Sequence, residues 1–81
     1  MENVSVAYVQ RLAWTAMLIE ARRHGLRPRL FYLGDPQDSR FGYELRVGGF
    51  AEHVRADDPG SLERLGRGAL EYLRSTPGLA G

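Results

Sequence analysis

The sequence contains no cysteine and no lysine, and these two absences exclude several kinds of chemistry. Without cysteine the chain forms no disulfide and offers no thiolate for metal binding or redox catalysis. Without lysine it has neither an amine for a Schiff base nor the lysine of a P-loop. All basic residues are therefore arginines. GC-rich codon usage is the simpler explanation, and recognition of phosphate or carboxylate groups is the functional one.

Long hydrophobic runs and a strong net charge are also missing. The longest apolar stretch, residues 12–19, is interrupted by Thr15 and is much shorter than the about 20 residues that span a bilayer. The N-terminus lacks the positive region of a signal peptide, so we expect a cytoplasmic protein that does not bind membranes. The formal net charge of +1 gives no general positive field for nucleic acid.

The length of 81 residues and the hydrophobic fraction of 43% are typical of one small globular domain. We expect a single domain over residues 1–81, with a loose tail at about 77–81. In a chain this short, apolar burial barely exceeds the conformational entropy lost on folding. The fold therefore needs dense packing of helices on a sheet, or a partner chain.

The first predicted helix covers residues 5–24. Asn3 or Ser5 caps its start, and a basic last turn followed by Gly25 marks its end. Its apolar side chains cover well over half of its circumference, more than one sheet requires. A second helix beside it is the simpler explanation and a partner chain is the functional one; both can hold.

The second predicted helix begins with Asp58 as its N-cap, followed by a proline, and runs to about Ser75. Gly66 and Gly68 lie inside this helix, where each costs about 1 kcal/mol relative to alanine. Two glycines within one helix indicate that another backbone comes close, and the first helix is the expected neighbour.

Three strands are predicted between the helices, over residues 29–33, 41–47 and 50–56. Gly48-Gly49 supplies a two-residue hairpin turn between the second and third strands. This turn places Tyr43, Glu44, Leu45, Arg46 and Val47 opposite Val54, His53, Glu52, Ala51 and Phe50. Glu52 then faces inward at the rim, which indicates an edge strand. The predicted fold is α+β, in the order α-β-β-β-α, with a three-stranded antiparallel sheet and both helices packed on one face.

This element order resembles that of the double-stranded RNA-binding domain over nearly the whole chain. In that family a lysine-rich cluster opens the second helix, whereas residues 61–64 here read Ser-Leu-Glu-Arg and follow Asp57 and Asp58. The family's proline–histidine loop has no counterpart in residues 34–42. The resemblance is therefore one of topology, without the residues that contact phosphate in that family.

Catalysis has few candidates in this sequence. The two histidines are His24 and His53, and His53 falls opposite Glu44, as a base and its orienting carboxylate would. No nucleophile or pocket accompanies them, so an ordinary cross-strand pair is the better interpretation. We expect a protein that is not an enzyme and that binds no cofactor and no metal.

The surplus apolar surface predicts a small non-enzymatic protein-interaction module, acting as a regulator, inhibitor or accessory subunit. It binds a protein partner or forms a homodimer. Aromatic and long apolar side chains anchor interfaces. The candidate contacts are Trp14, Met17, Leu18, Leu30 and Tyr32.

Nucleic-acid binding is the alternative. Arg22, Arg23, Arg27 and Arg29 fall close together with no acidic residue between them, as in a phosphate-contact patch. Tyr32 beside them offers a ring on which a base can stack. The helix dipole and solvation explain the first two arginines equally well.

Overall fold

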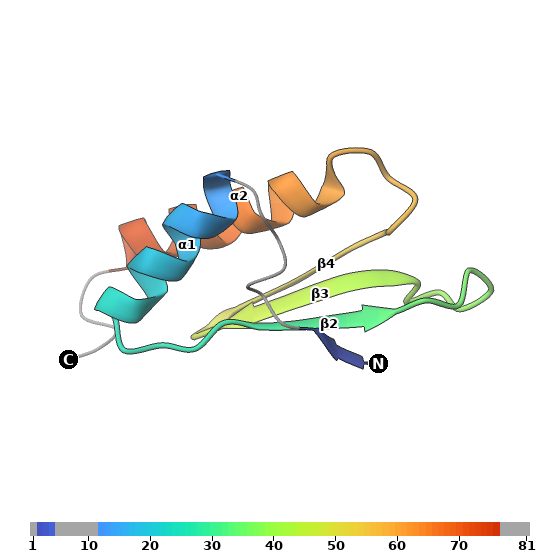
Figure 1. Ribbon diagram of the computed structural model, residues 1–81, viewed down its shortest axis with the longest axis horizontal. Helices are drawn as coiled ribbons and strands as arrows, with labels where there is room; N and C mark the ends of the chain where they lie inside the picture. Colours follow the sequence, from blue (N-terminus) through green and yellow to red (C-terminus); the bar gives the residue numbers. More distant parts are fainter. Residues whose placement is uncertain (1, 5–11, 77–81) are drawn as a thin grey trace.

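An antiparallel sheet carries both helices on one of its faces in the computed structural model (Figure 1). The structure describes residues 2–4 and 12–76. Its elements in chain order are β1 (Glu2–Val4), α1 (Leu12–Arg23), β2 (Arg29–Leu33), β3 (Gly42–Val47), β4 (Phe50–Val54) and α2 (Ser61–Ser75). The predicted three-stranded sheet and α-β-β-β-α order are confirmed. The predicted tail at about 77–81 lies outside the described residues.

A short fourth strand, β1, precedes the predicted elements. It pairs antiparallel with β2, and Asn3 lies opposite Phe31. The prediction that Asn3 caps the first helix is therefore wrong. β1 thereby covers the middle of the β2 edge, Leu30 to Tyr32, where backbone N–H and C=O groups would otherwise be unpaired. The other predicted cap, Ser5, and the first turns of the predicted helix lie outside the described residues.

The C-terminus of α1 follows the predicted glycine-ended pattern. Gly25 has a φ of 70°, in the left-handed region. The Gly25 N–H donates to the carbonyl of Arg22 at 3.0 Å, and the Leu26 N–H donates to the carbonyl of Ala21 at 2.9 Å. These two bonds form a Schellman motif, which satisfies carbonyls that the helix end leaves without partners. The reversed chain brings Leu26 onto the core and leads directly into β2.

The β3–β4 hairpin has the predicted register throughout, with Val47 opposite Phe50 and Glu44 opposite His53. Its two-residue turn is held from outside by α2, because the Gly49 N–H donates to the Tyr72 hydroxyl at 2.8 Å. β4 ends at Val54, two residues before the predicted end, and lies at the edge of the sheet as predicted.

The N-terminus of α2 differs from the prediction. The N-cap is Gly60, with a φ of 75°, and Asp58 is not the cap. The carbonyl of Asp58 accepts the Ser61 N–H at 3.1 Å, which closes a turn before the helix. The Asp58 carboxylate pairs with Arg64 instead of capping. Proline before glycine favours this turn, and only glycine adopts the left-handed conformation without strain.

Trp14 joins the two helices. Its side chain has no exposed surface, and its indole N–H donates to the carbonyl of Leu62 at 2.7 Å. A Cβ added to Gly66 would lie 2.6 Å from the indole ring. The first helix therefore approaches Gly66 with a side chain, and not with the backbone that was predicted. Gly68 does not face α1 at all, since its nearest neighbour is the ring of Phe50.

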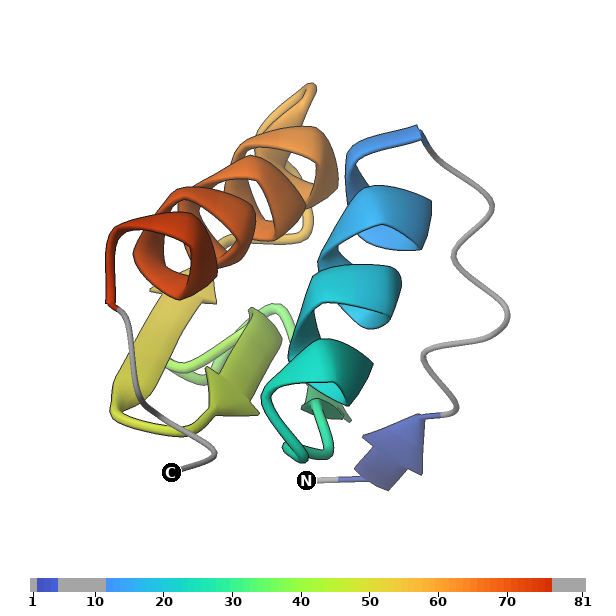
Figure 2. The same cartoon turned by 90° about the vertical axis from the view of Figure 1, so that its left-hand side faces the viewer.

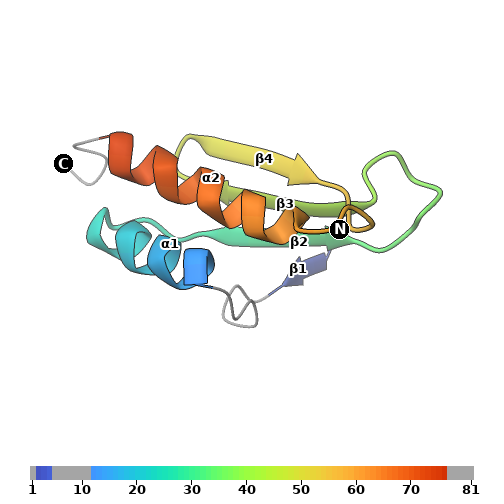
Figure 3. The same ribbon diagram turned by 90° about the horizontal axis from the view of Figure 1, so that it is seen from above.

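The hydrophobic core lies between the helix pair and the inner face of the sheet. Figure 2 shows α1 and α2 side by side above the strands, and Figure 3 shows that both run in the same direction. The fully buried large side chains are Trp14, Met17, Leu30, Leu45, Leu73 and Val47. Neither described helix covers the other face of the sheet, and no described element lies beside the flank of α1 that faces away from α2 (Figure 2).

The two glycines of α2 provide a matched test of this packing. Gly66→Ala should lower the free energy of unfolding by about 1 kcal/mol, because the strain of overpacking exceeds the gain in helix propensity. Gly68→Ala should raise it by about 0.5–1 kcal/mol, because its Cβ would lie at an ordinary 3.6 Å from the Phe50 ring. Urea denaturation measures both changes. Equal effects of the two substitutions would contradict the role of Trp14.

Candidate functional site

Three of the five predicted partner contacts are not available to a partner. Trp14, Met17 and Leu30 have no exposed surface, because α2 and the inner face of the sheet enclose them. Their assignment as contact residues is therefore wrong for the folded chain. The simpler explanation of the apolar first helix, a second helix beside it, accounts for this part of its surface.

The other two predicted contacts are half-buried and lie apart. Leu18 is on α1 and also packs against the core. Tyr32 lies opposite Tyr43 in the β2–β3 ladder, and their ring centroids are 4.8 Å apart. Tyr32 is thus engaged with its neighbour on the inner side of the sheet. The five predicted contacts do not form one surface.

The exposed apolar residues of α1 lie on its other flank. Leu12 is 89% exposed and Ile19 is 59% exposed, although both are large and hydrophobic. At about 100° per residue they lie about 140–160° around the helix from Trp14, nearly opposite the core. Together they form what we call the outer stripe of α1, and the half-buried Leu18 lies between this stripe and the core. The predicted set omitted Leu12 and Ile19, since periodicity alone does not show which side of an apolar helix packs on the sheet.

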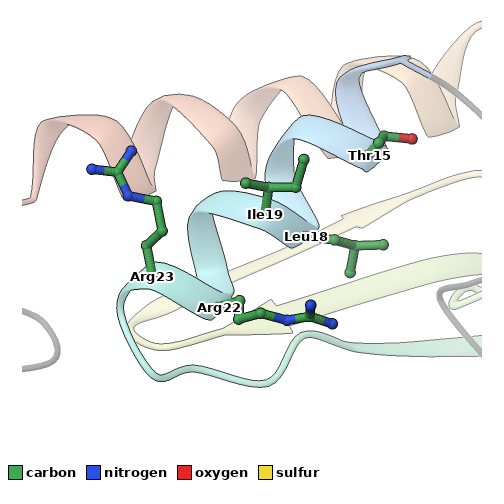
Figure 4. A pocket seen from close by; sticks show the side chains of 5 residues that line it. All are labelled: Thr15, Leu18, Ile19, Arg22 and Arg23. Carbon is green, nitrogen blue, oxygen red and sulfur yellow. The ribbon is translucent and has the colours of Figure 1, made fainter.

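A shallow hollow of about 300 Å³ adjoins the outer stripe, with Thr15, Leu18, Ile19, Arg22 and Arg23 in its lining. Figure 4 shows Thr15, Leu18 and Arg22 pointing to one side of α1 and Arg23 to the other. Arginine guanidinium groups therefore lie at one end of an apolar patch. This combination suits a protein partner whose apolar side chains are flanked by carboxylates.

The predicted basic cluster is partly neutralised. Arg23 pairs with Glu20 at 3.5 Å. Arg22, Arg27 and Arg29 are exposed, and none of them forms an ion pair with another described residue. They follow one another from the last turn of α1 into the start of β2, so they lie at the same end of the molecule.

Most other arginines are already paired. Arg40 binds Asp38, Arg46 binds Glu44, Arg55 binds Asp57, Arg64 binds Asp58 and Arg67 binds Glu63. These pairs are local in sequence and exposed, so each contributes little to stability. Because these acidic side chains are engaged locally, none of them compensates Arg22, Arg27 or Arg29.

The histidine–carboxylate arrangement considered for catalysis is not formed. His53 and Glu44 are opposite in the ladder, but the Glu44 carboxylate pairs with Arg46. His53 Nε2 lies 2.8 Å from the carbonyl oxygen of Arg40. In the described part of the chain, no three His, Cys, Asp or Glu side chains are grouped to hold a metal ion. Neither helix within residues 12–76 has the length and hydrophobicity to cross a bilayer.

The pair between Arg55 and Asp57 predicts a titration. Hydrogen bonds of 3.1 and 3.2 Å from the Arg55 guanidinium lower the pKa of Asp57 below its ordinary value. A lowered pKa in the folded chain means that the pair stabilises above the ordinary pKa and is lost as the pH falls through the lowered one. Arg55→Gln should therefore raise the pKa of Asp57 toward about 3.9.

Carboxyl NMR titration of both forms measures this change. Asp38 is the internal control, because Arg40 lowers its pKa in the same way and is not altered by the substitution. An Asp57 that titrates identically in the two proteins would contradict the pairing.

Comparison of the chain with protein-family models, with curated proteins and with solved structures gives no match. The candidate site consists of the outer stripe of α1 with the arginines beside it, and the uncompensated arginines continue from there into β2.

Proposed function

We propose that this chain is a small non-enzymatic protein-interaction module, of the kind used as a regulator, inhibitor or accessory subunit, and that the outer stripe of α1 is its contact surface. The observation that carries the proposal is the exposure of Leu12 and Ile19, at 89% and 59%, in a domain that buries its other large aliphatic side chains at least partly among the described residues. Large exposed apolar side chains that gather on one side of a helix are a feature of interaction sites.

The energetics favour coverage of this stripe. Fully burying one leucine or isoleucine side chain contributes roughly 1.5–3 kcal/mol. Arg22 adds a guanidinium with no ion pair to another described residue, and arginine is enriched at interface centres. Trp14 is the anchor expected from the sequence, but it is buried on the opposite side of α1, where it contacts α2.

A second copy of the chain is one partner that fits the stripe. Leu12 and Ile19 are seven residues apart on the same side of α1, about two helical turns. When two such helices pair antiparallel about a two-fold axis, Leu12 of one copy lies beside Ile19 of the other. Such an interface is self-complementary, as closed dimers require.

Ile19→Glu tests the stripe. The substitution places a charge in the apolar contact. If the partner is a second copy, dimer formation measured by sedimentation velocity should be lost; if it is another protein, its capture from native lysate should be lost. The variant's free energy of unfolding should change by no more than about 0.5 kcal/mol, because Ile19 is outside the core. Arg67→Gln, on the exposed side of α2, is the control with the same charge change. A monomeric wild type with an unchanged set of captured proteins would contradict the proposal.

Nucleic-acid binding through Arg22, Arg27 and Arg29 is the second candidate. It is favoured by the absence of ion pairs at these residues within the described chain. Tyr32 does not contribute to it, because its ring packs on Tyr43. Phe31 is on the opposite face of β2, where the Arg46 guanidinium lies 5.1 Å from its ring centroid.

The salt dependence of binding tests this candidate. Affinity for duplex DNA should fall with salt with a slope of about −0.9 per phosphate contacted, and Arg27→Gln should reduce that slope by about 0.9. Filter binding over a range of salt concentrations measures the slope. Lack of retained DNA or RNA at low ionic strength would remove nucleic acid as the ligand.

A further inference from the structure

β4 has an unpaired edge. It is the last strand of the sheet, and only its β3 side is hydrogen-bonded in the ladder. The two-residue turn joins a hydrogen-bonded pair, Val47 and Phe50, and bonded positions alternate along an antiparallel strand. The backbone N–H and C=O groups of Ala51 and His53 therefore point away from β3, toward the free edge. A free edge of this kind is a template for a further strand.

A groove runs beside this edge, between β4 and α2. It has a volume of about 230 Å³, and Phe50, Val54, Leu65 and Gly68 provide its apolar lining. The groove persists because Gly68 has no side chain to fill it. It opens on the helix side of the sheet, where every second side chain of a strand added to β4 would point. We call this space the edge groove.

Glu52 gives the edge groove its charge. It lies between Phe50 and Val54 on the same side of β4, is exposed, and forms no ion pair with another described residue. The cation in the lining is Arg64, whose charge is compensated by Asp58. His53 also borders the groove, but its ring nitrogen Nε2 contacts the carbonyl of Arg40. A positive side chain on an added strand would therefore meet an uncompensated carboxylate.

We propose that the edge groove binds an extended peptide by strand addition, with apolar side chains against Phe50 and Leu65 and an arginine or lysine opposite Glu52. Main-chain bonds to an edge strand give affinity in this mode, and the alternate side chains give specificity. This surface is separate from the outer stripe of α1, so the inference adds to the proposed function and does not depend on it.

A second copy of β4 fits the edge less well than a basic peptide. The register that pairs the whole strand antiparallel with its copy places Glu52 directly opposite the Glu52 of that copy. Like charges directly opposite each other destabilise a sheet. The same carboxylate thus opposes self-pairing and favours a partner strand of opposite charge.

The probe is a fluorescein-labelled peptide, Val-Thr-Arg-Thr-Val, titrated by fluorescence anisotropy into the full chain. The wild type should bind it, and amide hydrogen exchange at Ala51 and His53 should slow when it is bound. Glu52→Arg should weaken binding about tenfold or more and should restore binding to the charge-swapped peptide Val-Thr-Glu-Thr-Val.

Two further variants separate binding from folding. Gly68→Leu fills the groove while replacing glycine with a better helix former, so the fold should persist while binding is lost. Ala51→Pro removes an edge N–H that does not face β3, which edge strands tolerate, and it too should abolish binding. Ala51→Thr is the matched control and should bind like the wild type.

Three results would overturn the proposal. The first is no binding by the wild type, and the second is unchanged binding by Ala51→Pro and Gly68→Leu. The third is a dimer of the wild type that Ala51→Pro dissociates, which would assign the edge to a second copy of the chain. If Ile19→Glu changed neither dimer formation nor partner capture, the proposal for the outer stripe would fail while the peptide titration would still test the edge groove. The two surfaces are therefore tested independently.

Discussion

The contact between Trp14 and α2 determines how the rest of the molecule is arranged. The indole lies against Gly66, where no side chain stands in its way, and its N–H is satisfied by the carbonyl of Leu62. An indole N–H buried without such a partner would carry a desolvation cost, which this hydrogen bond removes. The contact therefore fixes the position of the helices along each other. Both helices then lie on one face of the sheet (Figure 1), and no described element lies on the opposite face or pairs with the outer edge of β4.

This arrangement also decides which apolar residues are left over. The sequence predicts more apolar surface on the first helix than one sheet can cover. The side of this helix that carries Trp14, Met17 and Ala21 is buried in the core. Only the opposite flank, with Leu12 and Ile19, remains exposed. The exposed apolar surface of α1 is therefore narrower than the sequence predicted and consists of different residues. A small domain without disulfides depends on dense packing for its stability, so its largest apolar side chains are needed in its own core.

The sheet was predictable because its signals are local. A two-residue glycine turn and a period of two determine the β3–β4 register, and both are read directly from residues 41–56. β1 was not predictable, since three residues carry no periodic pattern and its pairing with β2 is a long-range choice. The cap of α2 was assigned wrongly because Asp58 is a good N-cap by composition, whereas Gly60 adopts a conformation that moves the helix start. The contact residues on α1 failed for a third reason: helix periodicity does not identify the partner of each face.

Charge pairing explains why the two proposed surfaces differ in character. Asp38, Glu44 and Asp57 each pair with an arginine two residues away, and Asp58 and Glu63 pair with arginines of α2. Glu52, Arg22, Arg27 and Arg29 form no ion pair with another described residue. At the edge groove the uncompensated charge is negative, and beside the outer stripe it is positive. The two surfaces also lie on opposite flanks of the helix layer, since α2 borders the groove and α1 carries the stripe (Figure 2). Occupation of one flank therefore leaves the other accessible, and the opposite charges prevent one ligand type from suiting both.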